Sequence, residues 1–392
     1  MYLSDICMSG AETIVGNSNP EIKGISADSR LIKPGFLFAA LPGHKKDGRR
    51  FIADAIARGA SAILAAKGSK PPSGAINLPL ITSTDPRKSL AIFASRFYPI
   101  QPNISVAVTG TNGKTSVAWF TKRLWSALGY KAASIGTLGV DTGKNTLSSV
   151  GGLTTADPVT LHQTLQSLAI SNINAVILEA SSHGLDQRRL DGVRLRAGAF
   201  TNLSRDHLDY HKNMSSYRAA KRRLFDRLLP DGTTAVLHSD TKEYEEWKTI
   251  SRNRGLEIIS YGKTGADLKL INTKPNGQGQ KLTVKIMNRI HEISVPIAGS
   301  FQAENILCAI GLVLACGEDT EKVVAAASKL TTPIGRMELV GTLENNASIY
   351  VDYAHTPAAL EAALNALRKH TQNKLHLIFG CGGNRDTGKR EE

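Results

Sequence analysis

Residues 105–124 read Ser-Val-Ala-Val-Thr-Gly-Thr-Asn-Gly-Lys-Thr-Ser-Val-Ala-Trp-Phe-Thr-Lys-Arg-Leu and combine three local signals. The apolar, β-branched run at the start predicts a buried strand, and Gly110–Thr115 form a glycine turn. The residues that follow place Val117, Phe120 and Leu124 on one face of a helix. A strand, a glycine turn and a helix N-terminus in this order are typical of a phosphate-binding loop.

Each part of this turn suits phosphate. Glycines let the backbone approach phosphate oxygens, and the successive N–H groups and the helix dipole supply positive potential. Lys114 can reach the β and γ phosphates, and the Thr115 hydroxyl can bind Mg²⁺. The full signature also needs a glycine where Val108 stands, so an ordinary strand-turn-helix is the alternative. The predicted nucleotide-binding residues of the turn are Gly110, Thr111, Asn112, Gly113, Lys114 and Thr115.

The composition limits the class of protein. Of 392 residues, 41% are hydrophobic and 21% are charged, which is ordinary for a soluble globular protein of two or three domains. We expect no membrane contact, because no apolar run is long enough to span a bilayer and the N-terminus lacks an export signal. The four cysteines are scattered, which favours reduced thiols in a cytoplasm. The net charge is +14, but its clusters are short and lack interleaved aromatics, so we expect an anionic substrate and no nucleic acid.

Polar side chains follow other predicted strands. Residues 175–179 read Ala-Val-Ile-Leu-Glu, a strand that ends in Glu179, where a Mg²⁺ ligand is useful. The segment 201–211 is rich in oxygen and imidazole groups, and the helix that follows it turns Lys221 inward. The alternatives are that Glu179 caps a helix and that Lys221 extends its charged end to solvent.

Three further local patterns predict structure. Residues 86–97 read as a helix, and Asn276-Gly277 is a hairpin signal. Residues 375–379 read as a strand that leads into a glycine-rich loop. Asn305, on a predicted helix, is by itself most simply a solvated residue.

The sequence Thr-Gly-Thr-Asn-Gly-Lys-Thr of residues 109–115 resembles the phosphate-loop motif of the Mur ligase family, the ATP-dependent amide-forming enzymes of peptidoglycan assembly. The stretches 28–30 and 179–189 are similar to the member that adds the third peptide residue. The resemblance implies an α/β fold of three domains, of which the last is Rossmann-like and truncated, because the family's motifs continue beyond this chain. The implied domains are a uridine-nucleotide domain (1–101), a central P-loop parallel-sheet ATPase domain (102–332) and the start of an amino-acid-binding domain (333–392).

The resemblance also assigns residues. It implies that Lys221 reacts with CO₂ to give N6-carboxylysine, and that two Mg²⁺ ions bind. The implied catalytic residues are Lys114, Glu179, His207 and Lys221, and the implied metal ligands are Thr115, Glu179, His207 and Lys221. The implied ATP contacts beyond the turn are Asn305, Arg336, Asp352 and His355. The implied substrate-binding residues are Ser29, His44, Lys45, Lys46, Thr154, Thr155, Ser181, Gln187, Arg189 and Arg385.

The activity implied is that of a cytoplasmic, monomeric, ATP-dependent ligase. It would add the third amino acid to UDP-N-acetylmuramoyl-L-Ala-D-Glu through an acyl phosphate. We expect meso-diaminopimelate rather than L-lysine, because diaminopimelate is the commoner third residue in bacteria. The alternatives are another Mur or folylpolyglutamate-type ligase, and a truncated module that binds ATP without turnover.

Overall fold

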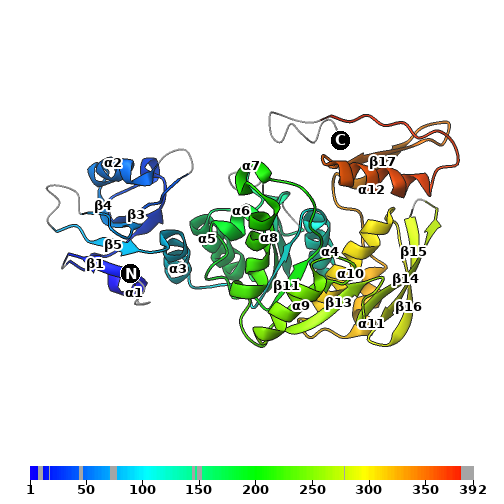
Figure 1. The fold of residues 1–392 in the computed structure, drawn as a ribbon, viewed down its shortest axis with the longest axis horizontal. Coiled ribbons are helices and arrows are strands. Elements are labelled where there is room, and N and C mark those ends of the chain that lie inside the picture. The colour runs from blue at the N-terminus through cyan, green and yellow to red at the C-terminus, as the bar shows by residue number, and fades with distance from the viewer. Residues whose placement is uncertain are drawn as a thin grey trace. The chain divides into compact units, whose positions relative to one another are not determined.

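The computed structural model describes residues 1–7, 12–16, 18–43, 47–70, 77–143, 146–147, 152–277 and 279–380 (Figure 1). The chain divides into two compact units. The first consists of Met1–Gln101, Ala156–Ser171 and Gln187–Arg194, and the second of Pro102–Thr155, Asn172–Asp186 and Leu195–Glu392. No helix in the described ranges is long and apolar enough to cross a lipid bilayer.

The first unit is built on a five-stranded sheet in the order β1-β5-β4-β3-β2. The strand β1 runs antiparallel to β5, and the other neighbours are parallel. The strands are β1 (Glu12–Val15), β2 (Gly24–Ser26), β3 (Phe36–Ala40), β4 (Ala60–Ala66) and β5 (Leu80–Ser83). The helices of this unit are α1 (Leu3–Ile6), η1 (Ser29–Leu31), η2 (Gly48–Phe51), α2 (Ile52–Ala57), α3 (Pro86–Phe97) and α5 (Pro158–Ile170).

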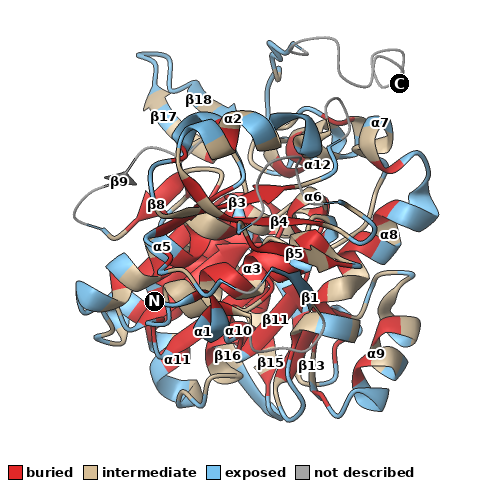
Figure 2. Ribbon diagram, turned by 90° about the vertical axis from the view of Figure 1, so that its left-hand side faces the viewer, coloured by how far each residue is buried: buried red, intermediate tan, exposed pale blue. Residues whose placement is uncertain are grey.

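Apolar residues cover both faces of this sheet. Along β3, Leu37 packs into one hydrophobic cluster and Phe38 into the other, because successive side chains point to opposite faces. Figure 2 shows β3 and β4 mainly in the colour of buried residues. The predicted helix over 86–97 is confirmed: Asp85 caps it by accepting a hydrogen bond from the Lys88 N–H (3.1 Å), and Pro86 is its first residue.

The second unit is built on an eleven-stranded sheet in the order β16-β15-β14-β13-β12-β11-β6-β10-β7-β8-β9. The run from β14 to β7 is parallel, whereas both ends of the sheet are antiparallel. The strands are β6 (Ile104–Thr109), β7 (Ala132–Gly136), β8 (Gly139–Asp141), β9 (Thr146–Leu147), β10 (Ala175–Glu179), β11 (Ala197–Phe200), β12 (Thr234–His238), β13 (Glu257–Gly262), β14 (Leu268–Asn276), β15 (Gly279–Ile286) and β16 (Arg289–Val295). A separate pair is formed by β17 (Arg336–Thr342) and β18 (Ser348–Asp352).

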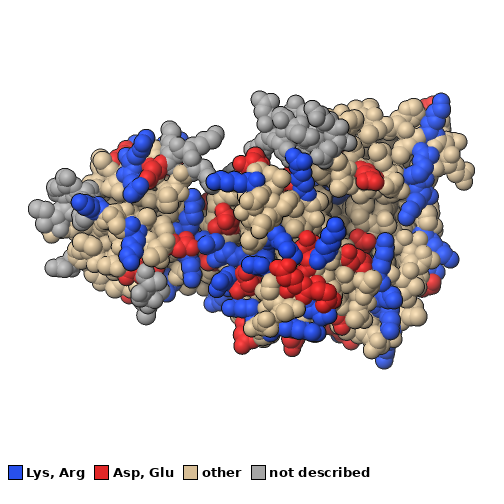
Figure 3. All heavy atoms as spheres, in the orientation of Figure 1, with Lys and Arg blue, Asp and Glu red and all other residues tan. Residues whose placement is uncertain are grey.

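The helices of the second unit cover the sheet and carry the polar groups at its edge. They are α4 (Lys114–Ala127), α6 (Ser182–Asp186), α7 (Leu208–His211), α8 (Met214–Arg223), η4 (Leu224–Leu228), α9 (Tyr244–Asn253), α10 (Ser300–Leu314), α11 (Thr320–Ala327) and α12 (Pro357–Arg368). The helices α4 and α10 pack on each other and share one core with the central strands. Figure 3 shows Lys and Arg side chains in many separate places on this face, some of them beside Asp and Glu side chains.

Two predictions about local structure have opposite outcomes. The hairpin at Asn276-Gly277 is confirmed, since β14 and β15 are antiparallel and pair Asn276 with Gly279. The strand predicted over 375–379 is wrong, because residues 373–380 have no regular secondary structure and Ile378 is 100% exposed. An apolar run becomes a strand only beside a neighbour, and β17 is the single strand that pairs with β18 in the described chain.

A buried ion pair links α4 to β8. The Lys122 Nζ lies 2.9 Å from the Asp141 Oδ2, and the two side chains are only 1% and 8% exposed. Removing one partner leaves the other charge buried and uncompensated. This lowers the free energy of unfolding far more than replacing both partners by apolar residues does. The pair therefore fixes the antiparallel β8 against the helix that follows the glycine turn.

We predict that Asp141→Asn lowers the free energy of unfolding by about 3–5 kcal/mol, because it leaves the Lys122 charge alone in the core. The double variant Lys122→Met/Asp141→Leu should recover most of this loss. Urea denaturation followed by circular dichroism measures both effects.

The matched control is the exposed cross-strand pair Lys281–Glu292, whose atoms are 2.8 Å apart but whose side chains are 43% and 59% exposed. The substitution Glu292→Gln should cost less than about 1 kcal/mol. Equal losses in Asp141→Asn and Glu292→Gln would show that burial of the first pair does not matter for stability.

Candidate functional site

The glycine turn approaches two neighbouring segments so closely that side chains are excluded. Gly113 has a φ of +89°, and a Cβ there would lie 2.4 Å from the Asn305 Oδ1. A Cβ on Gly110 would lie 1.8 Å from the Thr201 Oγ1. These contacts hold the turn against the segment that follows β11 and against α10, and both positions require glycine.

Hydrogen bonds fix the backbone between the two glycines. The Thr111 N–H donates to the Asn202 carbonyl (2.8 Å), and the Asn112 N–H donates to the Asn202 side-chain oxygen (3.0 Å). The Thr201 hydroxyl donates to the Asn112 carbonyl (2.6 Å). These three hydrogen bonds make the turn a preformed loop at the N-terminus of α4.

Lys114 is the first residue of α4, and its side chain folds back over the loop. Its Nζ donates hydrogen bonds to the carbonyls of Gly110 and Thr111, both at 2.9 Å. Burial lowers the pKa of Lys114, while the nearby Glu179 and Asp206 carboxylates raise it. The ammonium group thus lies at the mouth of the loop.

Glu179 is buried at the end of β10 and is held by hydroxyl and amide groups. The Thr115 hydroxyl donates to its Oε2 (3.1 Å), and Thr137 donates from its N–H (2.9 Å) and its hydroxyl (3.1 Å). The Arg336 guanidinium donates to the Thr115 Oγ1 (3.2 Å). A carboxylate and a hydroxyl side by side are oxygen ligands of the kind that Mg²⁺ prefers, so the residues present fit this ion.

Lys221 is brought to the same loop from α8. Its side chain is buried, and its Nζ donates to the Gly110 carbonyl at 2.6 Å. Burial lowers its pKa well below the usual value, and the nearby Lys114 charge lowers it further, whereas Asp206 opposes this shift. Its ammonium lies 4.4 Å from the centre of the Tyr217 ring. The inward direction of Lys221 is as the sequence predicts.

His207 lies beside this group and is 42% exposed. Its Nε2 is 3.3 Å from the Asp206 Oδ2. Burial lowers the pKa of His207, and the charges of Lys114 and Lys221 act in the same direction. Asp206 therefore influences the pKa of all three of these groups, although it is not among the residues predicted from the sequence.

The predicted substrate-binding residues fall into three sets. Thr155 and Ser181 lie beside Glu179, because the Thr155 hydroxyl donates to the Glu179 carbonyl (2.7 Å) and lies 2.9 Å from the Ser181 hydroxyl. The Thr154 hydroxyl is 3.2 Å from the hydroxyl of Thr137. Ser29, Gln187 and Arg189 belong to the first unit. His44, Lys45, Lys46 and Arg385 lie outside the described residues.

Asn305 is buried against the loop, so its interpretation as a solvated residue is wrong. Its amide donates to the Gln302 side-chain oxygen (3.0 Å), and the Gln302 amide donates to the Arg336 carbonyl (3.2 Å). These two hydrogen bonds link α10 to the start of β17. In the sequence, only the helical spacing of the polar residues Gln302 and Asn305 indicates such a link.

The remaining predicted ATP contacts lie at the start of β17 (Arg336), at the end of β18 (Asp352) and just beyond that strand (His355). The Asp352 carboxylate accepts hydrogen bonds from the N–H groups of Met337 and Ala354, both at 2.8 Å, and burial raises its pKa. His355 is exposed, and its Nδ1 lies 3.0 Å from the Tyr353 carbonyl. Of this set, Arg336 makes the direct contact with the loop region, through Thr115.

Comparisons with known proteins identify the family of the chain. Family profiles match residues 21–98 (Mur ligase family, catalytic domain), 108–313 (Mur ligase middle domain) and 335–392 (Mur ligase, glutamate ligase domain). The chain belongs to the Mur ligase family. A relative from Caulobacter vibrioides, named UDP-N-acetylmuramoyl-L-alanyl-D-glutamate--2,6-diaminopimelate ligase, is 46% identical over 377 residues, which cover 95% of this chain and 77% of that protein. A Zymomonas mobilis relative of the same name is 48% identical over 372 residues, or 95% and 75% of the two chains.

Solved structures of Mur ligases have the same fold. A structure of a UDP-N-acetylmuramoyl-L-alanyl-D-glutamate--2,6-diaminopimelate ligase is 30% identical with a TM-score of 0.81, and the match covers 100% of this chain and 78% of that one. MurF from Acinetobacter baumannii is 18% identical with a TM-score of 0.66, over 94% and 76% of the two chains, and shows likeness of fold alone. The predicted fold class, the α/β architecture of Mur ligases, is confirmed.

We predict that Gly113→Ala weakens ADP binding at least about tenfold, because its Cβ forces the loop away from Asn305. Isothermal titration calorimetry with ADP measures the effect.

The control is Gly129→Ala, which has a similar φ of +92° but no atom within 4 Å of the added Cβ. This variant carries only the left-handed backbone strain of about 1–2 kcal/mol and should bind ADP normally. Unchanged ADP affinity in Gly113→Ala would exclude this loop as the nucleotide site.

Proposed function

We propose that the protein is an ATP-dependent ligase that adds meso-diaminopimelate to UDP-N-acetylmuramoyl-L-Ala-D-Glu in peptidoglycan precursor synthesis. The observation that carries this proposal is the meeting of Lys114, the Thr115–Glu179 pair and Lys221 around one preformed phosphate loop. The names of the similar proteins from Caulobacter vibrioides and Zymomonas mobilis support the choice of substrates.

The reaction has two steps. The free carboxylate of the muramoyl dipeptide attacks the γ-phosphorus of ATP, and the bond to the β,γ-bridging oxygen breaks to give an acyl phosphate and ADP. The amine of diaminopimelate then attacks the acyl carbon, inorganic phosphate leaves, and the new amide nitrogen loses a proton. Lys114 stabilises the charge that spreads over the transferred phosphoryl oxygens, and the loop amides position them.

We propose that the ligands for two Mg²⁺ ions are Thr115, Glu179, His207 and Lys221 in its carboxylated form. The oxygen pair of Thr115 and Glu179 supports one ion, and the neighbouring imidazole of His207 supports the other. When bound, these ions neutralise charge on the phosphate oxygens. Thr137 orients Glu179 for this role by holding both of its carboxylate oxygens.

We propose that Lys221 carries a carbamate. Its lowered pKa favours the neutral amine, whose lone pair attacks the carbon of CO₂; an N–C bond forms and one proton leaves. The product is an anion and removes the electrostatic conflict between a lysine and a neighbouring cation.

The other assignments extend the same proposal. We place the domains at 1–101, 102–332 and 333–392, and we expect a monomer in the cytoplasm. ATP is bound by residues 110–115 together with Asn305, Arg336, Asp352 and His355. The muramoyl substrate is bound by Ser29, His44, Lys45, Lys46, Thr154, Thr155, Ser181, Gln187 and Arg189, and the amino acid by Arg385.

We predict that the purified protein releases phosphate from ATP only when UDP-N-acetylmuramoyl-L-Ala-D-Glu and meso-diaminopimelate are both present. Lys114→Met should lower turnover by about 10²–10³-fold, because transition-state charge is then less stabilised. A coupled phosphate assay and mass spectrometry of the tripeptide product measure this.

Other substrates decide between the alternatives. Turnover with L-lysine but not with diaminopimelate would show that L-lysine is the amino acid that is added. Turnover with D-Ala-D-Ala or with a folate and glutamate would assign another ligase of the same fold. ADP binding without turnover on any of these substrates would leave a nucleotide-binding module and overturn the ligase proposal.

We predict that wild-type protein equilibrated with ¹³C-bicarbonate shows a carbamate resonance in its NMR spectrum, and that Lys221→Arg lacks it. This variant should also lose turnover by about 10²-fold or more, because arginine forms no carbamate. The control is Lys212→Arg, which changes an exposed lysine and should retain both the carbamate resonance and the turnover. A carbamate resonance that persists in Lys221→Arg would place the modification on another amine.

A further inference from the structure

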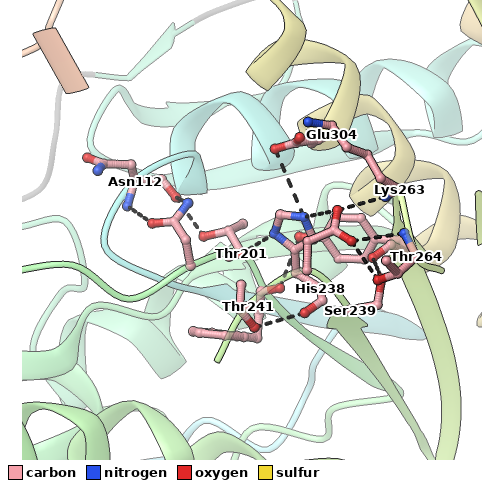
Figure 4. Close-up of polar contacts among 12 residues, drawn as sticks. Asn112, Thr201, His238, Ser239, Thr241, Lys263, Thr264 and Glu304 are labelled. Carbon is pink, nitrogen blue, oxygen red and sulfur yellow. Dashed lines mark hydrogen bonds and ion pairs between the residues drawn. The ribbon is translucent and has the colours of Figure 1, made fainter. Parts of the chain in front are cut away.

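A second group of metal-ligating side chains lies behind the phosphate loop, apart from the residues assigned above. His238 is the last residue of β12, Asp240 follows two positions later, and Glu304 lies on α10. The His238 Nε2 is 3.5 Å from the Asp240 Oδ2 and 4.0 Å from the Glu304 Oε2. One atom from each side chain lies within 4.8 Å of the others (Figure 4).

The hydrogen bond of the other ring nitrogen defines the chemistry of His238. The Nδ1 is 2.7 Å from the Thr201 carbonyl, which can only accept, so Nδ1 carries the proton. In the neutral ring the Nε2 then holds an unprotonated lone pair. This atom is buried and makes no hydrogen bond within the described ranges, and the whole side chain is only 10% exposed. Its lone pair is directed at two carboxylates, an arrangement that is repulsive unless a cation or a proton lies between them.

Neighbouring residues hold the possible ligands in place. The Tyr261 ring stacks on the imidazole, with centroids 4.7 Å apart and an interplanar angle of 10°. The Asp240 carboxylate accepts hydrogen bonds from the N–H groups of Lys263 (2.7 Å) and Thr264 (2.9 Å) and from the Thr264 hydroxyl (2.6 Å). A histidine that donates to a backbone carbonyl and a carboxylate that is itself hydrogen-bonded are the supports that metal ligands usually have.

We propose that His238, Asp240 and Glu304 bind one divalent transition-metal cation, of the class of Zn²⁺. One imidazole nitrogen and two carboxylate oxygens form a ligand set of the kind that Zn²⁺ binds in proteins. The charges facing the site are those of the two carboxylates and of Lys263, which interacts electrostatically with Glu304.

The position of the group gives a bound cation a structural consequence. The Thr201 residue that accepts from His238 also donates its hydroxyl to the Asn112 carbonyl in the phosphate loop. Glu304 is adjacent to Asn305, which packs on Gly113 of the same loop. The cation would therefore join β12 to α10 behind the loop. The proposal shares no ligand with the Mg²⁺ sites and does not depend on the proposed reaction.

The test is a Zn²⁺ titration of the full chain after removal of metals with EDTA, in competition with a chromophoric chelator. The wild type should bind one Zn²⁺ that His238→Asn and Glu304→Gln each weaken at least about tenfold. Measurements are repeated in a His207→Asn background, which removes the imidazole of the other proposed metal site. If His238→Asn and Glu304→Gln lower Zn²⁺ affinity equally in that background, the bound Zn²⁺ is assigned to His238 and Glu304.

The control is His291→Asn. This imidazole has the same 10% exposure, and among the described residues it pairs with one carboxylate, that of Glu321 at 3.9 Å, so Zn²⁺ affinity should not change. Circular dichroism and urea midpoints establish that each variant is folded. If His238→Asn does not fold, the Zn²⁺ affinity of the near-isosteric Glu304→Gln decides the proposal. Wild-type Zn²⁺ affinity in folded Glu304→Gln overturns the proposal. So does a ¹⁵N spectrum in which both nitrogens of His238 are protonated at pH 7 in the presence of Zn²⁺, since the group is then an internal ion pair.

Discussion

The arrangement of the site depends on the pairing of β6 with β10 on one side and β11 on the other. The parallel register sets Glu179 level with Val108, and Phe200 level with Thr109. Because all three strands run the same way, their carboxyl ends meet at one edge of the sheet. Strand pairing therefore brings together three parts of the site: the phosphate loop, the carboxylate of Glu179 and the segment that begins at Thr201.

The charges at this edge explain why the site suits anionic ligands. Lys114 and Arg336 are brought close to one loop, and burial lowers the pKa of each. The Glu179 carboxylate raises the pKa of both groups, which favours the charged forms that attract phosphate oxygens. The desolvation that makes these cations costly in the protein alone also strengthens their interaction with a bound anion.

The sequence predicted the parts of this site that depend on neighbours in the chain. The strand, turn and helix around the loop have local signals, as do the helix that begins at Pro86 and the hairpin at Asn276-Gly277. Family resemblance supplied the candidate roles of distant residues. The strand over 375–379 was predicted wrongly because strand formation depends on a pairing partner that residue preferences do not reveal.

Contacts between distant segments could not be predicted in the same way. Thr137 holds Glu179 from a turn after β7, and Asp206 acts on three basic groups at once. Neither residue has a distinctive local pattern, because threonine and aspartate are common in turns. Their importance follows only from the sheet order, which places the ends of β7, β10 and β11 around β6.

The helix α10 shows how one element can serve several such contacts. Its consecutive residues Glu304 and Asn305 face different partners, the end of β12 and the phosphate loop. One turn earlier, Gln302 accepts from Asn305 and donates to the Arg336 carbonyl. A displacement of α10 must therefore alter the loop, the His238 group and the start of β17 together. Since α10 also packs on α4 within the main hydrophobic core, the same apolar contacts that stabilise the unit maintain the geometry of all three polar groups.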